Sequence, residues 1–190
     1  MIIFISKTYT LSQASANKRG IDIPKPIRLF LLKSVIVFTA WQLLYSLVLA
    51  PIRIPDNFLT NITAASTAKI MSIFYGHIDA ALNAFKVILR LNGKKVIGIA
   101  DPCNALEIYV LYLGFLICYP ASARLRVIFI AIGLPAIFVA NVVRCCLLVW
   151  LNIAHRGWVD IAHHYIFTAL VYLIVFYLWM IYSKKAHFVK

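Results

Sequence analysis

Residues 101–151 read DPCNALEIYVLYLGFLICYPASARLRVIFIAIGLPAIFVANVVRCCLLVWL, two long apolar runs joined by a short turn that carries Arg124 and Arg126. Another long apolar run occupies 163–182, and an earlier one ends at residue 50. Each is close to the roughly 20 residues that cross a ~30 Å hydrocarbon core. The sequence therefore predicts an all-α polytopic membrane protein with about four transmembrane helices.

The composition supports a membrane protein as well. Hydrophobic residues make up 63% of the chain and the mean hydropathy is +0.89, whereas a soluble domain is about half apolar. The formal net charge is +13, but the basic residues are scattered between the apolar runs and form no patch that would bind nucleic acid. Basic residues at the ends of spans are instead typical of loops on the cytoplasmic side.

The distribution of basic residues predicts how the chain crosses the membrane. With both termini inside, eleven Lys and Arg residues fall on the cytoplasmic side, although the large outer loop carries six of its own. We expect one membrane domain over 1–190 with these parts: cytoplasmic tail 1–26, first span 27–50, extracytoplasmic loop 51–102, second span 103–120, third span 127–151, fourth span 163–182 and cytoplasmic tail 183–190.

The outer loop contains two structured segments. Residues 57–75 have apolar side chains at helical spacing among polar ones, which predicts an interfacial helix, with a spanning or re-entrant segment as the alternative. Residues 85–99 form two strand-like runs around Asn92-Gly93, the preferred pair for a type I′ β-hairpin. The returning strand leads to Cys103. This hairpin is either one wall of a peptide groove or a simple cap.

Three ionisable residues lie at the same end of three different predicted spans. If the spans alternate in direction, Cys103 begins one, Arg144 lies in the last third of the next, and His164 begins the last. An ionisable residue at membrane depth is costly and points to function. Their convergence predicts a shared site near the outer membrane face.

Cys103 is the strongest candidate for a reactive group. Cys118, Cys145 and Cys146 lie inside apolar runs, where cysteine behaves as a small hydrophobe. No second cysteine lies in an outer loop to form a disulfide with Cys103, and no close-spaced pair of ligands supports a metal site. A nucleophilic thiol, stabilised as a thiolate by cations and a helix N-terminus, fits best. No metal or other cofactor is expected.

The residues around the proposed site have structural alternatives. Arg144 can pair with Glu107 or extend to the interface, which needs no catalytic role. Asn141 lies one helical turn before Arg144 and faces nearly the same way. His163 and His164 are adjacent, so their side chains point about 100° apart and we expect at most one to face Cys103.

These segments resemble the exosortase/archaeosortase family: DPCNALEIYVLY at 101–112, PAIFVANVVR at 135–144 and AHHYIFTALVYL at 162–173. The resemblance implies a cysteine transpeptidase or protease in which Cys103 is the nucleophile and Arg144 stabilises the oxyanion. It favours His164 over His163 as the acid and base. Asn104, Glu107, Asn141 and His163 are expected to support the site or bind substrate. Ala105 departs from the family's usual glycine, which puts the width of the site in question.

The resemblance also implies a location and partners. The enzyme is expected in the bacterial cytoplasmic (inner) membrane as a multi-pass protein, with its active site on the extracytoplasmic face. Its substrates are expected to be exported proteins that end in a short motif, an apolar span and basic residues. The product passes to an amine acceptor or to water. A non-enzymatic membrane scaffold for surface protein or polysaccharide export is the alternative. A redox protein lacks a second outer cysteine, and a transporter lacks polar residues through the span.

Overall fold

A computed structural model describes residues 24–83 and 86–187. Three of its helical segments are long and apolar enough to cross a membrane: Lys25–Ile52, Ala123–Ala154 and Phe167–Ala186. A small antiparallel sheet is the other component. The protein is therefore a multi-pass, predominantly helical membrane protein, as the sequence predicted.

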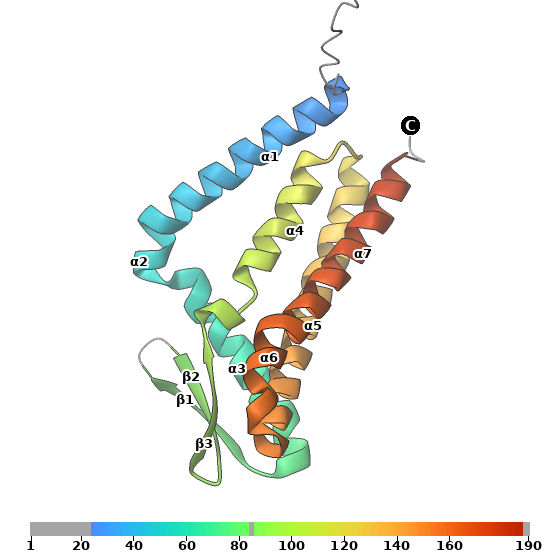
Figure 1. Ribbon diagram of the computed structural model, residues 1–190. Helices are drawn as coiled ribbons and strands as arrows, with labels where there is room; N and C mark the ends of the chain where they lie inside the picture. Colours follow the sequence, from blue (N-terminus) through green and yellow to red (C-terminus); the bar gives the residue numbers. More distant parts are fainter. Residues whose placement is uncertain (1–23, 84–85, 188–190) are drawn as a thin grey trace, which may run out of the picture.

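The helical elements follow one another along the chain as α1 (Lys25–Leu44), the π-turn η1 (Tyr45–Leu49), α2 (Ala50–Ile52), α3 (Ile54–Tyr75), the 3₁₀ turn η2 (Asp101–Cys103), α4 (Leu106–Cys118), α5 (Ala123–Ala154), the 3₁₀ turn η3 (Arg156–Trp158), α6 (Val159–Ile161), the π-turn η4 (Ala162–Ile166) and α7 (Phe167–His187). The long helices alternate in direction (Figure 1). The start of α1 and the end of α7 lie at one end of the molecule, and the sheet lies at the other, here called the sheet end (Figure 1).

The helices differ from the predicted spans mainly in length. The span expected over 103–120 is helical only over Leu106–Cys118, a length of about 20 Å at 1.5 Å per residue. A 3₁₀ turn and the left-handed residue Ala105 come before it. By contrast, α5 has 32 residues and is about 48 Å long. It therefore extends beyond a ~30 Å hydrocarbon core.

The sheet has the strand order β1–β2–β3, with β1 at Ile78–Asn83, β2 at Lys86–Leu91 and β3 at Lys94–Ala100. The predicted hairpin is present, and Asn92 and Gly93 have φ angles of 51° and 77°, the positive values that a type I′ turn requires. The sequence did not predict β1, which pairs with β2 in an antiparallel register from Ile78↔Leu91.

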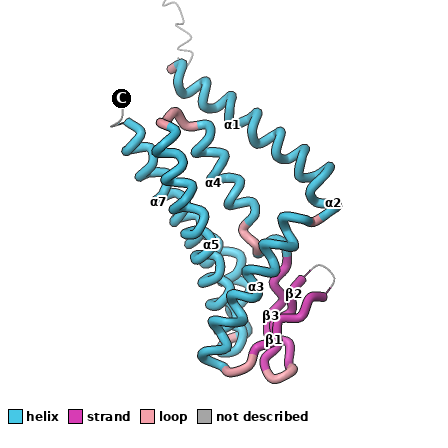
Figure 2. Tube along the Cα trace, turned by 180° about the vertical axis from the view of Figure 1, so that it is seen from behind, coloured by secondary structure: helices cyan, strands magenta, loops and turns pink. Residues whose placement is uncertain are grey.

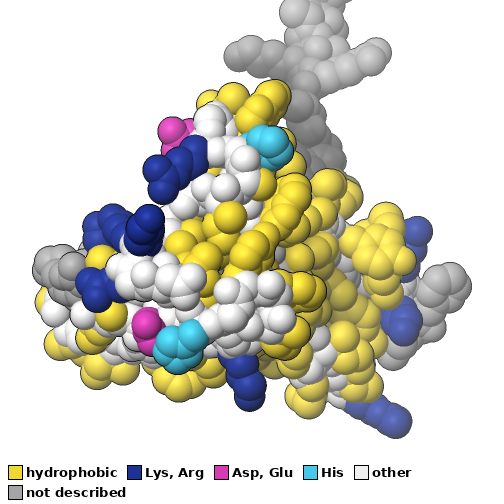
Figure 3. Space-filling view, turned by 90° about the horizontal axis from the view of Figure 1, so that it is seen from below, with side chains coloured by type: hydrophobic (Ala, Val, Ile, Leu, Met, Phe, Trp, Pro, Cys, Tyr) yellow, Lys and Arg dark blue, Asp and Glu magenta, His cyan; other side chains and the backbone are white. Residues whose placement is uncertain are grey.

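One face of the sheet packs on α3 and α5 (Figure 2). Its core contains Ala64 and Met71 of α3, Leu89 and Ile99 of the sheet, and Val149 of α5. Figure 3 views the sheet end and shows Lys and Arg side chains around the edge of this face, with hydrophobic side chains exposed between them. The sheet is thus attached to the helices through apolar contacts and carries its charges outside.

A second core joins α4, α5 and α7. Tyr112 and Tyr182 are fully buried, and their hydroxyls donate to the carbonyls of Phe129 and Leu116. Gly133 lets the Tyr112 ring lie directly against α5, because a Cβ there would be 2.1 Å from the Tyr112 hydroxyl oxygen. In contrast, α1 has no buried residue and packs only against the edge of this core.

The helix predicted over 57–75 lies within α3, and its buried face is unusually polar. Buried positions include Asp56, Thr60, Thr63 and Thr67, next to Ala64. A helix that faced a purely apolar core would bury its apolar side instead. The segment 101–104, which connects β3 to α4, provides polar partners for Asp56 and Thr60, and the Thr67 hydroxyl donates to the Thr63 carbonyl of the same helix.

Candidate active site

The loop that carries Cys103 connects β3 to α4. Asp101–Cys103 form the 3₁₀ turn η2, and the side-chain oxygen of Asn104 accepts a hydrogen bond from the backbone N–H of Leu106 at 2.8 Å. This contact spans two residues, as in an Asx turn, and it fixes the chain just before α4 begins. Ala105 has φ 63°, a left-handed conformation that glycine adopts without steric cost. The left-handed backbone conformation at this position explains why the family that the sequence resembles usually has glycine there.

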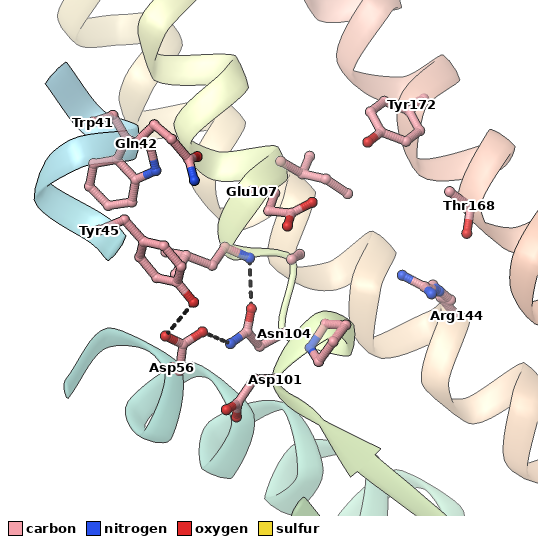
Figure 4. Close-up of a pocket in the computed structure, with 14 residues that line it drawn as sticks. Trp41, Gln42, Tyr45, Asp56, Asp101, Asn104, Glu107, Arg144, Thr168 and Tyr172 are labelled. Carbon is pink, nitrogen blue, oxygen red and sulfur yellow. Dashed lines mark hydrogen bonds between the residues drawn. The ribbon is translucent and has the colours of Figure 1, made fainter. Parts of the chain in front are cut away.

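A group of polar side chains fixes this loop on α3, on Arg53 just before it and on the π-turn η1. Arg53 donates to the Asp101 carboxylate through Nε at 3.1 Å and Nη2 at 2.6 Å, and the Thr60 hydroxyl donates to the same carboxylate at 3.0 Å. Asn104 donates to Asp56 at 2.9 Å, and Tyr45 donates to the other Asp56 oxygen at 3.1 Å (Figure 4). We call these residues the polar joint. Each buried carboxylate has the partners that it needs.

α5 contributes Asn141 and Arg144, which lie one helical turn apart. Asn141 donates from Nδ2 to the backbone carbonyl of Cys103 at 2.9 Å, so it holds the backbone at Cys103. Arg144 is only 6% exposed, and its Nε has no hydrogen-bond partner among the described residues. Glu107 is exposed, and no ion pair joins it to Arg144 among the described residues. Arg144 therefore has hydrogen-bonding capacity left for a ligand.

His163 lies between the cysteine and the arginine. Its Nε2 is 4.0 Å from the Cys103 sulfur, and its Nδ1 is 3.5 Å from Arg144 Nη2. The π-turn η4 contains His163, and the Thr168 hydroxyl donates to the His163 carbonyl at 2.9 Å. The His164 side chain lies outside the described part of the structure. The geometry thus brings together Cys103, Arg144 and His163.

Two cavities flank this group. The helix cavity, about 280 Å³, lies among α1, the active-site loop, α4, α5 and α7, and Figure 4 shows Arg144 and Glu107 on its walls. The sheet cavity, about 170 Å³, is lined by β3, α5 and α6 together with Cys103 and His163. Arg144 lines the first cavity and Cys103 lines the second. The site is thus bordered by open volume on both sides.

Sequence reasoning missed the polar joint. Arg53, Asp56 and Thr60 were placed in the outer loop without a role. The available signal was the scarcity of acids, only six Asp and Glu in 190 residues. A carboxylate within such an apolar chain needs a partner.

The described cysteines are all free thiols. Within 24–83 and 86–187, no group of three His, Cys, Asp or Glu residues is arranged to hold a metal ion. The chemistry that the described side chains themselves offer is that of a thiol, an imidazole and a guanidinium.

The fold and site together define a class: multi-pass membrane proteins in which a cysteine, a histidine and an arginine from separate helices or loops meet at one end of the bundle. Residues 26–181 match the family model described as transmembrane exosortase. The chain belongs to this family. Membership supports a general role as a membrane transpeptidase of the cysteine type. No curated protein and no solved structure gives a significant match.

Proposed function

We propose that this protein is a cysteine transpeptidase that cleaves the C-terminal sorting signals of exported proteins at the outer face of the bacterial inner membrane. The observation that carries the proposal is the contact of Cys103 Sγ with His163 Nε2 at 4.0 Å, beside the buried Arg144. A nucleophile, a proton-transfer group and a fixed cation are what acyl transfer through a thioester requires. No metal or other cofactor takes part in this mechanism.

In the first half-reaction, the Cys103 proton moves to His163 Nε2 and the thiolate attacks the scissile carbonyl. Arg144 donates to the developing oxyanion. The C–N bond then breaks, and His163 returns the proton to the leaving amine. Arginine can only donate, so while Arg144 contacts Nδ1 the neutral imidazole carries its proton on Nε2 and cannot accept a second one there. Binding of the substrate carbonyl by the guanidinium ends this contact. Nδ1 then takes a proton from water while Nε2 releases its own proton to water, which leaves Nε2 able to accept the thiol proton.

In the second half-reaction, an amine or water attacks the thioester carbonyl. The C–S bond breaks, and Cys103 leaves as a thiolate. The product is an amide with an amine acceptor and a carboxylic acid with water. Both outcomes use the same three side chains, so they depend on which nucleophile reaches the thioester.

The choice of histidine differs from the expectation that the family resemblance gave. His163 Nε2 contacts the thiol and Nδ1 contacts Arg144, which supports His163 as the acid and base. A π-turn adds one residue to the helical turn, so a regular helical wheel does not give the correct direction for either histidine. We therefore assign the role to His163.

The test is an exported reporter that ends in a short motif, an apolar span and basic residues, followed by immunoblot in cells. Cys103→Ala is expected to abolish processing, and Arg144→Lys to reduce it severely because an ammonium lacks the planar paired donors. His163→Ala is expected to be severe and His164→Ala mild. Cys118→Ala, a buried thiol away from the site, is the matched control and is expected to be near neutral.

The same series separates the alternatives. Full processing by Cys103→Ala would end the enzyme proposal and favour a scaffold. A stronger defect for His164→Ala than for His163→Ala would return the role to His164.

The proposed orientation has its own test. The sheet end is proposed to lie outside the cell, and Asn92 lies there, opposite the end of α7 (Figure 1). Single cysteines at Asn92 and Lys184 are expected to react with an impermeant reagent only at Asn92. Labelling of Lys184→Cys from outside would contradict the orientation.

A further inference from the structure

The described carboxylates fall into two groups. Asp56 and Asp101 belong to the polar joint, and Asp79 pairs with His77 at 2.8 Å. Glu107 and Asp160 have no hydrogen-bond or ion-pair partner among the described residues. Each of these two lines one of the cavities beside the site, Glu107 the helix cavity and Asp160 the sheet cavity. Both side chains are exposed, so water can hydrate them, and the observation that matters is their position beside the cysteine, histidine and arginine in a chain with a net charge of +13.

The sheet cavity combines the reactive thiol with one carboxylate. Its walls are Ile97–Ile99 of β3, Cys145 and Leu148 of α5, Val159 and Asp160 of α6, and Cys103 and His163. Among the described residues that line it, Asp160 supplies the only polar side chain apart from the thiols and the imidazole. Asp160 and His163 both line this cavity. A ligand in this cavity would meet one negative charge beside the sulfur.

A supporting role in proton transfer does not account for Asp160. In a cysteine–histidine–carboxylate arrangement, the carboxylate holds the ring nitrogen that does not face the nucleophile. Here that nitrogen, Nδ1, faces Arg144 Nη2. Asp160 also lies in the first turn of a helical segment, where an acid interacts favourably with the helix dipole. This interaction with the helix dipole would affect the stability of the protein and not the choice between nucleophiles.

We propose that the sheet cavity is the acceptor site and that Asp160 binds the ammonium group of a primary amine. The inference rests on the proposed function, because it concerns the second half-reaction. The nucleophile must reach the carbonyl carbon bonded to the Cys103 sulfur, and Cys103 lines this cavity.

The chemistry of this step balances. The ammonium bound at Asp160 loses one proton to water, and the neutral nitrogen attacks the thioester carbonyl while Arg144 holds the oxyanion. The C–S bond breaks, Cys103 leaves as a thiolate, and the second nitrogen proton passes to His163. The products are an amide and the enzyme, ready to attack again.

The experiment compares two nucleophiles that resolve the same thioester. The full-length protein is reconstituted in phosphatidylcholine vesicles, which contain no primary amine, with a tailed substrate. Glycinamide, which is cationic at neutral pH, competes there with hydroxylamine, which is uncharged. Mass spectrometry gives the ratio of amide to hydroxamate product. Because both products come from one intermediate, their ratio does not depend on how fast that intermediate forms.

We expect Asp160→Asn to lower the amide-to-hydroxamate ratio by about tenfold, the effect of losing one charge-assisted hydrogen bond. Asp160→Glu is expected to retain most of the ratio. Asp79→Asn is the matched control, because this acid is exposed on β1 and pairs with His77. A purely structural role for Asp160 would lower the thermal midpoint and leave the ratio unchanged.

An unchanged ratio in Asp160→Asn overturns the acceptor site. So does wild-type protein that forms hydroxamate and free acid but no amide, although cysteine cleavage would then stand. Wild-type protein that forms no amide, no hydroxamate and no free acid overturns the proposed function and this inference together.

A second experiment tests whether the amine comes from a lipid or from solution. Vesicles of phosphatidylethanolamine without glycinamide test a lipid headgroup. A lipid-linked product that falls with Asp160→Asn supports the site with a lipid amine. Glycinamide transfer without a lipid-linked product supports it with a soluble amine.

Discussion

Where α4, α5 and α7 pack together, the buried side chains are aromatic or aliphatic, whereas at the polar joint they are carboxylates, an amide and hydroxyls. Tyr112 and Tyr182 fill the first region, and Asp56, Thr60 and Asn104 are buried in the second. Apolar contacts are non-directional and grow with the area removed from water. Hydrogen bonds have preferred distances and angles. The helix core therefore supplies stability, and the polar joint supplies the position of the Cys103 loop.

This contrast has a consequence for substitutions. A change in the helix core should lower the stability of the whole protein, because its side chains are close-packed. A change in the polar joint, or in the contact from Asn141, should lower activity more than stability. The following predictions test this separation, beginning with the largest expected effect.

Gly133→Ala is expected to lower the free energy of unfolding by about 3 kcal/mol, because overpacking a core forces side chains or backbone to move. The new methyl would be 2.1 Å from the Tyr112 hydroxyl oxygen. Thermal unfolding in detergent measures the effect. Gly157→Ala is the control, because a Cβ there has no heavy atom within 4 Å. Equal stability of the two variants would contradict this account of the core.

Asn141→Leu keeps the number and branching of the side-chain heavy atoms and removes the donor to the Cys103 carbonyl. We expect processing to slow by about 30-fold, which corresponds to about 2 kcal/mol for a buried carbonyl left without its partner. The reporter assay measures the rate, and thermal unfolding is measured alongside. A loss of stability as large as that of Gly133→Ala would show that Asn141 stabilises the helix core and does not act by positioning Cys103.

Thr60→Val removes one hydroxyl from the polar joint without changing its size. We expect the activation free energy of processing to rise by about 1 kcal/mol, which makes the reaction roughly fivefold slower. The effect is this small because Asp101 keeps its bonds to Arg53. Thr67→Val is the matched control, since the Thr67 hydroxyl donates to the Thr63 carbonyl of its own helix. If both variants slow processing equally, the joint has no special part in placing Cys103.

Ala105→Gly is expected to produce the smallest change, and a favourable one. The residue has φ 63°, a conformation that costs a residue with a Cβ about 1 kcal/mol. The unfolding free energy should therefore rise by up to that amount. A fall in the thermal midpoint on substitution would show that the Ala105 methyl is needed for packing.

Much of the fold could be predicted because its signals are local. Long apolar runs predicted the spanning helices, and Asn92-Gly93 predicted the hairpin. The first strand was missed because Ile78–Asn83 is short and has no turn dipeptide that links it to β2. The start of α4 was placed too early, because hydropathy does not report the left-handed conformation of Ala105.

The candidate site was only partly predictable. Cys103 and Arg144 lie at the matching ends of neighbouring spans, so alternating topology was enough to suggest that they meet. The Arg53–Asp101 pair joins residues that are 48 positions apart, and no periodic pattern reports such a contact. The direction of His163 depends on a π-turn, which a regular helical periodicity does not reveal.

The shortness of α4 has a consequence for the surrounding lipid. A helix of 13 residues covers about 20 Å and leaves roughly 10 Å of a ~30 Å hydrocarbon layer unmatched. A helix shorter than the hydrocarbon layer is accommodated by local thinning of the bilayer. We therefore expect a bilayer with shorter acyl chains to match α4 better. The thickness of the membrane is also expected to affect the conformation of the loop that carries Cys103, because that loop leads directly into α4.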